Sequence, residues 1–63
     1  MAHRILRLPA VMDVTGLGRT TVYEQMAAGR FPKGIKLSER AVGWLEADIQ
    51  NWIETKVLES THD

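Results

Sequence analysis

The segment TGLGRTTVYEQMAAGRFP, residues 15–32, limits the folds open to this chain more than any other feature. Two glycines flank Leu17, and a third glycine and a proline close the segment. Glycine ends helices because it adopts the left-handed backbone conformation without strain, and proline prevents a helix from continuing. We therefore expect a tight turn around Leu17 that joins two short helices. The second helix is expected to begin near Gly18 or Arg19 and to end at Gly29.

The first helix is predicted between Pro9 and Gly16. Proline suits the first position of a helix because its missing N–H would be unpaired there in any case. Val11 and Val14 lie three residues apart and give this helix an apolar edge. Gly16 is expected to form a left-handed C-terminal cap. Residues 5–8, ahead of the helix, form a brief β-prone run.

The second helix is predicted to bury one of its sides. Its apolar and aromatic positions recur at the spacing of a buried stripe, namely Val22, Tyr23, Met26 and Ala27. At about 100° per residue, the opposite side carries Thr20, Thr21, Glu24 and Ala28. Small polar side chains on this outward side would allow the helix to lie close against another surface.

Two further elements are predicted downstream of the second helix. Two β-prone runs, residues 35–37 and 41–45, are separated by a few polar residues and indicate a hairpin. Gly43 inside the second run indicates a close backbone approach or a bulge. From Glu46 onward the apolar period is helical, with a stripe formed by Leu45, Ile49, Trp52, Ile53 and Val57.

The predicted order is β-prone run, helix, tight turn, helix, hairpin and helix. Two helices joined by a short glycine-containing turn form a helix-turn-helix, and a hairpin directly after the second helix forms a wing. A chain of 63 residues has room for one domain. The expected fold class is therefore mainly α with a small β-hairpin, a winged helix-turn-helix. Within a single domain, 1–63, the helix-turn-helix covers about 9–29, the wing about 35–45 and the C-terminal helix about 46–59.

The charges of the chain are unevenly distributed, although they sum to zero. Residues 1–40 carry seven Lys or Arg against three Asp or Glu, a net charge of +4. Residues 41–63 carry one against five, a net charge of −4. Such asymmetry suggests a basic working face supported by an acidic element. Chance segregation of so few charges would give the same totals, so charge alone assigns no function.

The second helix of a helix-turn-helix presents its N-terminal side chains to base edges in the major groove. Arg19 carries a planar fork that can reach guanine or clamp a phosphate. The hydroxyl of Thr20 either caps the helix or contacts DNA, whereas Thr21 is expected to face outward and to favour contact. Tyr23 is expected to lie mostly in the core, with its hydroxyl within reach of a phosphate. Glu24 could accept a hydrogen bond from cytosine, but a solvated charge at the groove's edge is the preferred interpretation.

The hairpin region carries a second candidate group, made of cations and one hydroxyl: Lys33, Lys36, Ser38 and Arg40. A basic tip of this kind would bind the DNA backbone or minor groove through counterion release, with little reading of sequence. Without a helix-turn-helix beside it, an ordinary solvated turn would be preferred. Arg30 could instead stabilise the C-terminal end of the second helix. Arg4 and Arg7 receive no assignment.

The sequence offers no sign of an enzyme, a cofactor or a metal site. It contains no cysteine, no phosphate-binding loop and no Ser/His/Asp constellation supported by glycines. His3 and His62 stand near opposite ends of the chain, which argues against a shared metal ion. Trp44 and Trp52 are assigned to the core rather than to base stacking. No apolar run approaches the about 20 residues of a membrane span, and no signal-peptide core is present. We therefore expect a soluble protein of the bacterial cytoplasm and nucleoid, with no membrane partner and no small-molecule substrate.

Three pieces of the sequence carry a resemblance to a known family: TGLGRTTVY, the exit GRFPK, and RAVGWLEADIQNWI. In their order and spacing they make the chain resemble, over nearly its whole length, the AlpA family of small phage and prophage regulators. This is a MerR-like winged-helix group that overlaps with excisionases. The resemblance implies a site-specific binder of double-stranded DNA that regulates integrase expression or acts as an excisionase, a recombination directionality factor. It also implies that Arg19, Thr20, Thr21 and Tyr23 belong to the recognition helix and Arg40 to the wing.

Two positions depart from the family pattern. Gly18 stands where serine is frequent, which weakens the helix cap, and Glu24 stands where a basic or polar residue is frequent. The expected partners are double-stranded DNA, further copies of the protein on repeated sites, and an integrase. The alternative is a small protein-interaction module on the same scaffold, which is favoured by the acidic residues of the last helix: Glu46, Asp48, Glu54 and Glu59.

Overall fold

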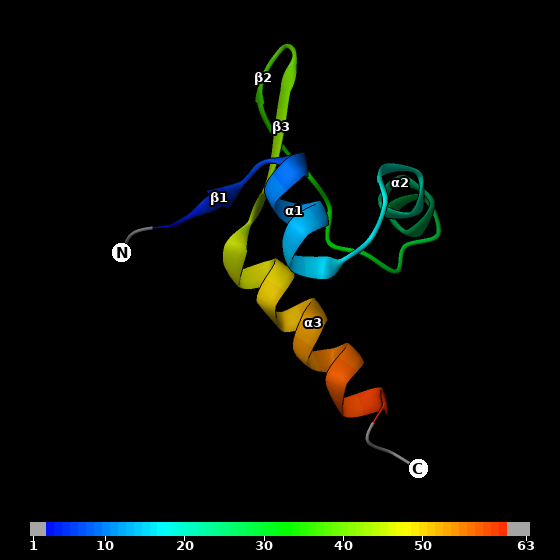
Figure 1. The fold of residues 1–63 in the computed structure, drawn as a ribbon. Coiled ribbons are helices and arrows are strands. Elements are labelled where there is room, and N and C mark those ends of the chain that lie inside the picture. The colour runs from blue at the N-terminus through cyan, green and yellow to red at the C-terminus, as the bar shows by residue number, and fades with distance from the viewer. Residues whose placement is uncertain (1–2, 61–63) are drawn as a thin grey trace.

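The structure, a computed structural model, describes residues 3–60. Its elements are, in order, β1 (Ile5–Leu6), α1 (Leu8–Thr15), α2 (Arg19–Ala27), β2 (Ile35–Ser38), β3 (Ala41–Leu45) and α3 (Glu46–Ser60). The β2–β3 hairpin projects at one end of the molecule and α3 runs toward the other, with α1 and α2 beside their junction (Figure 1). The expected fold class, mainly α with a winged helix-turn-helix arrangement, is confirmed.

The tight turn between α1 and α2 is held by local hydrogen bonds. Gly16 has the left-handed conformation expected of it, with a φ of 74°, and its N–H donates to the carbonyl of Met12 at 2.8 Å. The hydroxyl of Thr15 donates to the carbonyl of Val11 at 2.6 Å and accepts a 3.3 Å bond from the N–H of Leu17. Leu17 itself packs against the core. These contacts fix the direction in which the chain leaves α1.

The end of α2 is also set by a left-handed glycine. Gly29 has a φ of 73°, and its N–H donates to the carbonyl of Met26 at 3.0 Å. The N–H of Arg30 donates to the carbonyl of Gln25 at 2.9 Å. This pair of bonds is the Schellman arrangement, which satisfies two carbonyls that the helix would otherwise leave open. Phe31 then turns back into the core, where it is 6% exposed.

The strands form one three-stranded antiparallel sheet in the order β1-β3-β2. Leu6 of β1 lies opposite Trp44, and Lys36 of β2 lies opposite Val42. The register shifts between Lys36 and Ser38, which places a bulge in β2. The hairpin is confirmed. Its pairing with residues 5–6 could not be predicted from the sequence, because a strand of two residues is too short to show an alternating pattern that would indicate its partner.

Gly43 lies where two neighbouring segments approach β3 most closely. A Cβ atom at this position would overlap Cγ2 of Ile5 and would lie 3.1 Å from both Cδ1 of Leu37 and the carbonyl oxygen of Leu6. The close backbone approach expected at Gly43 is therefore confirmed. A side chain at position 43 would prevent β1 from lying this close to β3.

A single cluster of apolar side chains forms the core: Leu6, Val11, Val22, Phe31, Trp44 and Ile49. Trp44 is 1% exposed, and its indole N–H donates to the carbonyl of Pro32 at 3.1 Å. Trp52 packs edge-on against Phe31 with ring centroids 5.0 Å apart and lies partly buried at the border of the core. The assignment of both tryptophans to packing is confirmed.

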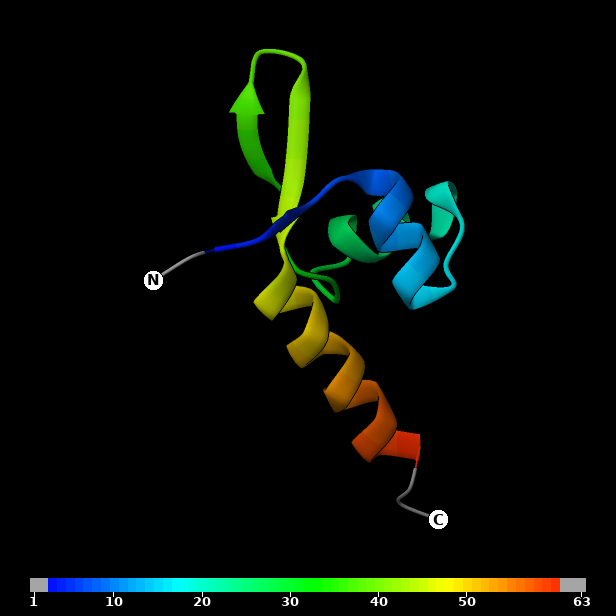
Figure 2. The same cartoon turned by 60° about the vertical axis from the view of Figure 1, so that its left-hand side comes forward.

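Four residues that the sequence placed on apolar stripes are exposed, namely Val14 (45%), Tyr23 (50%), Val57 (54%) and Ala27. The later turns of α3 extend beyond the other elements in both views (Figures 1 and 2), and Val57, which belongs to α3, keeps 54% of its surface exposed. Val14, near the end of α1, and Val57 both line a shallow groove between α1 and α3. Stripe periodicity identifies a side of a helix, but it does not show how far along the helix a covering partner reaches.

The helix α2 is rotated about its axis relative to the prediction. Its exposed side carries Arg19, Thr20, Tyr23, Glu24 and Ala27, whereas its covered side carries Thr21, Val22, Gln25 and Met26. The apolar residues of α2 are spread around the helix, so their spacing favoured the wrong rotation. Contacts of Val22 and Met26 with the core decide it instead. Ala28, expected on the outward side, is exposed at the end of the helix.

Three smaller boundaries also differ from those expected. The helix α1 begins at Leu8, so that Pro9 lies inside its first turn rather than at its first position. Ser38 is the last residue of β2 rather than part of the connecting loop. The helix α3 continues to Ser60. Each shift is one residue, which is the usual uncertainty of element ends.

Candidate nucleic-acid interface

The first turn of α2 presents uncapped backbone and exposed side chains. Gly18 occupies the N-cap position, supplies no side-chain hydrogen bond, and is followed by a first turn without an acidic residue. Arg19 and Thr20 are exposed, and no hydrogen bond among residues 3–60 engages the Thr20 hydroxyl. The capping role considered for Thr20 is therefore absent here, and its hydroxyl is open to a ligand.

The exposure of Thr21 and that of Tyr23 are the reverse of those expected. Thr21 is half-buried, because it lies on the side of α2 that turns toward the core next to Val22. Tyr23 is 50% exposed instead of lying mostly in the core. Glu24 is exposed on the same side as Tyr23, as expected of a solvated charge. The outward surface of α2 thus consists of an arginine, a threonine, a tyrosine and a glutamate.

A hollow of about 370 Å³ lies between the start of α1, the start of α2 and the wing. Its lining includes three arginines from three separate segments, together with an aromatic hydroxyl and two wing side chains: Arg7, Arg19, Arg40, Tyr23, Val42 and Trp44. None of the residues that line it is acidic. We call this surface the arginine hollow. Guanidinium groups donate hydrogen bonds and accept none, so the hollow suits an anion or the acceptor atoms of base edges.

The wing contributes one face to the arginine hollow. Side chains two apart along a strand point to the same side, which places Val42 and Trp44 together on that face. Lys36 is the direct cross-strand neighbour of Val42 and therefore lies on the same face of the hairpin. Arg40 sits in the turn between β2 and β3 and reaches the hollow from the tip. The two wing cations expected to bind backbone thus lie on the side that faces α2.

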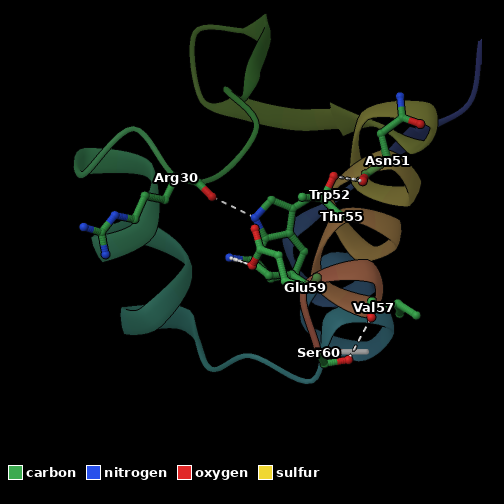
Figure 3. Close-up of polar contacts among 8 residues, drawn as sticks. Arg30, Asn51, Trp52, Thr55, Val57, Glu59 and Ser60 are labelled. Atoms are coloured by element: carbon green, nitrogen blue, oxygen red, sulfur yellow. Dashed lines mark hydrogen bonds and ion pairs between the residues drawn. The ribbon is translucent and has the colours of Figure 1, made fainter. Parts of the chain in front are cut away.

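The remaining predicted residues lie apart from the arginine hollow. Ser38 is exposed at the end of β2, and Lys33 is exposed in the connection between α2 and β2. Neither of them lines the hollow. Arg30 borders a different surface, beside Trp52 and Asn51 of α3, where its carbonyl accepts the Trp52 N–H at 2.7 Å (Figure 3).

Sequence reasoning missed Arg7. Its Nε–H donates to the carbonyl of Val42 at 3.0 Å, which joins the residue before α1 to the wing. The contact spans 35 positions of sequence, so no local pattern announces it. In the structure Arg7 directly precedes α1 and lines the same hollow as Arg19.

Within residues 3–60 there is no group of three or more histidine, cysteine or acidic side chains that could hold a metal ion. His3 is exposed, and His62 lies outside the described residues. No helix in that same stretch combines the length and the apolar character that crossing a bilayer requires.

The fold and its surface define a small winged helix-turn-helix protein whose basic side is built from α1, α2 and the wing. A family model described as "Prophage CP4-57 regulatory protein (AlpA)" matches residues 4–57. The chain belongs to this AlpA family of prophage regulatory proteins, which confirms the resemblance noted in the sequence. The family is one of regulators rather than a class of enzymes.

The chain is also similar to two individual proteins, of which the first carries the name of the same family. The protein named "DNA-binding transcriptional activator AlpA" of Escherichia coli strain K12 is 41% identical over 61 residues, in a match covering 87% of this chain and 87% of the relative. The uncharacterized protein ORF88 of Enterobacteria phage P4 is 37% identical over 55 residues, in a match covering 87% of this chain and 62% of the relative.

Proposed function

We propose that this protein is a transcriptional regulator that binds double-stranded DNA, with α2 in the major groove and the wing over the neighbouring backbone or minor groove. The arginine hollow is the observation that carries the proposal. Arg7, Arg19 and Arg40 come from three separate segments and converge without an acidic neighbour in the lining. The E. coli relative is named a DNA-binding transcriptional activator, which supports the same activity here.

The proposed roles of the residues follow from their exposure. Arg19 and Thr20, at the exposed start of α2, read base edges, and Tyr23 offers its hydroxyl to the backbone. Thr21 acts at the border of the contact, since it is half-buried. Glu24 remains solvated at the groove's edge and limits how closely phosphates approach. The wing and its approach supply backbone contacts through Lys33, Lys36, Ser38 and Arg40.

The biological role we propose is prophage control. The protein regulates integrase expression, acts as an excisionase, or does both, in the bacterial cytoplasm and on the nucleoid. One recognition helix reads only a few base pairs, so several copies are expected on repeated sites. In the excisionase role, the proposed protein partner is an integrase. We propose that residues 1–63 act as a single domain in these contacts.

Footprinting on the DNA that flanks the protein's own gene tests this proposal. The expected result is one or more protected sites at regular spacing, with affinity that falls steeply as salt rises. The target, the number of copies and their spacing then emerge from one experiment. Absence of any protection on flanking or genomic DNA at low salt would overturn the assignment.

A second function, that of a protein-interaction module, is favoured by the exposed apolar groove between α1 and α3. Val14 and Val57 are 45% and 54% exposed there, beside an otherwise acidic helix. A module of this kind would be retained by a protein partner in a pull-down and would give no gel shift with DNA. The gel shift distinguishes the two functions, and an excisionase would score in both assays.

A further inference from the structure

We infer that the arginine hollow seats the sugar–phosphate backbone of one DNA strand, and that Arg7 is a phosphate-binding residue within it. This inference rests on the proposed function and assigns a residue to which neither the sequence pattern nor the family resemblance gives a role. It also identifies what kind of DNA contact Arg7 makes, namely one to phosphate rather than to a base.

The first argument is geometric. A helix in the major groove and a wing at the adjacent minor groove are separated by the backbone strand that divides those grooves. The arginine hollow lies between α2 and the wing, so that strand crosses it. Trp44, which is buried, is one of its lining residues, and the three arginines and Tyr23 contribute side chains with hydrogen-bond donors to the same lining. A phosphate in the hollow would therefore have donors available from three separate segments of the chain.

The second argument concerns the hydrogen bonds of Arg7. Its Nε–H is already held by the carbonyl of Val42 at 3.0 Å. The remaining N–H groups of the guanidinium are left to a ligand, in a plane that the first bond orients. Fixing the side chain before binding reduces the entropy that binding must overcome. Arg7 is therefore a prepared donor rather than a freely moving surface cation.

The third argument is electrostatic. Among residues 3–60, no carboxylate forms an ion pair with Arg7, Arg19 or Arg40. Arg4, only three positions before Arg7, is by contrast paired with Glu46 at 3.5 Å. Like charges gathered in one hollow repel one another unless an anion occupies it. The charge of Arg4 is therefore balanced within the protein. The charges of the three arginines in the hollow have no such partner in the part of the chain that the structure describes and are available to an anion.

The test uses the full chain and a short fluorescein-labelled duplex of mixed sequence. Fluorescence anisotropy titrations at several KCl concentrations give the slope of log affinity against log salt. Arg7→Ala is expected to lower this slope by about 0.9, because one phosphate contact is lost. The matched control, Arg4→Ala, removes the same charge from a paired position and is expected to keep the wild-type slope. Circular dichroism melting checks that each variant is folded.

Arg7→Lys separates charge from orientation. Lysine keeps the charge but cannot reproduce the Nε–H bond to Val42 while offering a planar fork. We expect the wild-type salt slope with affinity weakened roughly tenfold. An Arg7→Lys variant that binds as tightly as wild type would overturn the role of the Val42 bond. If Arg7→Ala fails to fold, Arg7→Gln, which keeps an N–H donor but carries no charge, gives the same test of the salt slope.

A purely structural Arg7, one that only ties the wing to α1, would change stability and leave the slope unaltered. An Arg7→Ala variant that folds, binds and keeps the wild-type slope therefore overturns the inference while leaving DNA binding intact. Loss of all duplex binding by the wild-type protein would instead overturn the proposed function itself. The two failures are thus distinguished within the same set of titrations.

Discussion

The indole N–H of Trp52 donates a 2.7 Å hydrogen bond to the backbone carbonyl of Arg30, which ties the middle of α3 to the chain just after α2 (Figure 3). Phe31, the next residue, packs edge-on against the same indole with ring centroids 5.0 Å apart. A residue in the C-terminal helix therefore holds the exit of the proposed recognition helix. Trp52 belongs to the acidic part of the chain, residues 41–63, whereas α2 belongs to the basic part, residues 1–40. The acidic part therefore helps to position the helix proposed to bind DNA.

Trp52→Phe is expected to destabilise the protein by about 1 kcal/mol, because it removes the hydrogen bond to Arg30 while keeping an aromatic ring against Phe31. Urea denaturation measures the change. The control is Lys56→Met, which removes the cation lying 5.5 Å from the Trp52 ring centroid but leaves the indole in place. That exposed contact should contribute less, about 0.5 kcal/mol. Equal stability of Trp52→Phe and wild type would show that the bond does not hold the end of α2.

Gly43→Ala is expected to destabilise the protein by roughly 1–3 kcal/mol, since the new methyl group would overlap Ile5 and crowd the Leu6 carbonyl. Ile5→Ala in the same chain removes the side-chain part of the clash. The double variant should therefore lose less stability than the sum of the two single variants. Thermal melting of the four proteins completes the cycle. Strict additivity would mean that β1 does not pack over Gly43 as described.

The parts of the fold that the sequence predicted are those controlled by backbone conformation. Gly16 and Gly29 both adopt positive φ where helix ends were expected, and Gly43 marks a close approach. These positions are readable because few residues other than glycine can occupy them. The helix-turn-helix was predicted from Gly16 and Gly29, and the wing from the two β-prone runs that follow α2.

The parts that escaped prediction depend on which neighbour covers which surface. Tyr23 is exposed and Thr21 half-buried because α2 has no single apolar side, so the core contacts of Val22 choose its rotation. Arg7 joins the arginine hollow through a carbonyl far along the chain. Neither relationship leaves a local trace in the sequence, and together they decide the composition of the candidate interface.

Gly18 offers a way to separate helix stability from DNA binding. Its φ of −78° and ψ of 166° suit any N-cap residue, and a Cβ atom there meets nothing within 4 Å. Gly18→Ser should stabilise the protein by roughly 0.3 kcal/mol, and Gly18→Asp by roughly 0.5–1 kcal/mol, since a carboxylate also favours the helix N-terminus. Melting curves measure both changes.

The same two variants are expected to diverge in DNA binding. The Gly18→Asp carboxylate stands beside Arg19 at the proposed contact and repels phosphates, so its affinity should fall while its stability rises. Gly18→Ser, without a charge, should bind at least as well as wild type. Anisotropy with one duplex compares them. Unimpaired binding by Gly18→Asp would place the DNA away from the start of α2.

Arg40→Ala is expected to weaken binding to all duplexes alike and to lower the salt slope by about one, because a wing cation contacts phosphate rather than bases. Arg30→Ala is the matched control, since Arg30 is exposed but borders α3 instead of the arginine hollow. Titrations of each variant against two unrelated duplexes, at several salt concentrations, measure its affinity for each duplex and its salt slope. A change in preference between the duplexes would instead make Arg40 a reader of sequence.

Thr20→Ala is expected to alter base preference more than Thr21→Ala does. Thr20 is exposed at the start of α2, whereas Thr21 is half-buried on the side of the helix that faces the core. Loss of one hydroxyl contact corresponds to a roughly threefold to tenfold change in relative affinity among sites. Selection from a randomised duplex library, followed by competition binding, measures the preference of each variant. If Thr21→Ala shifted the preference and Thr20→Ala did not, α2 would have to meet the bases with the opposite flank, and the arginine hollow could not lie over the adjoining backbone.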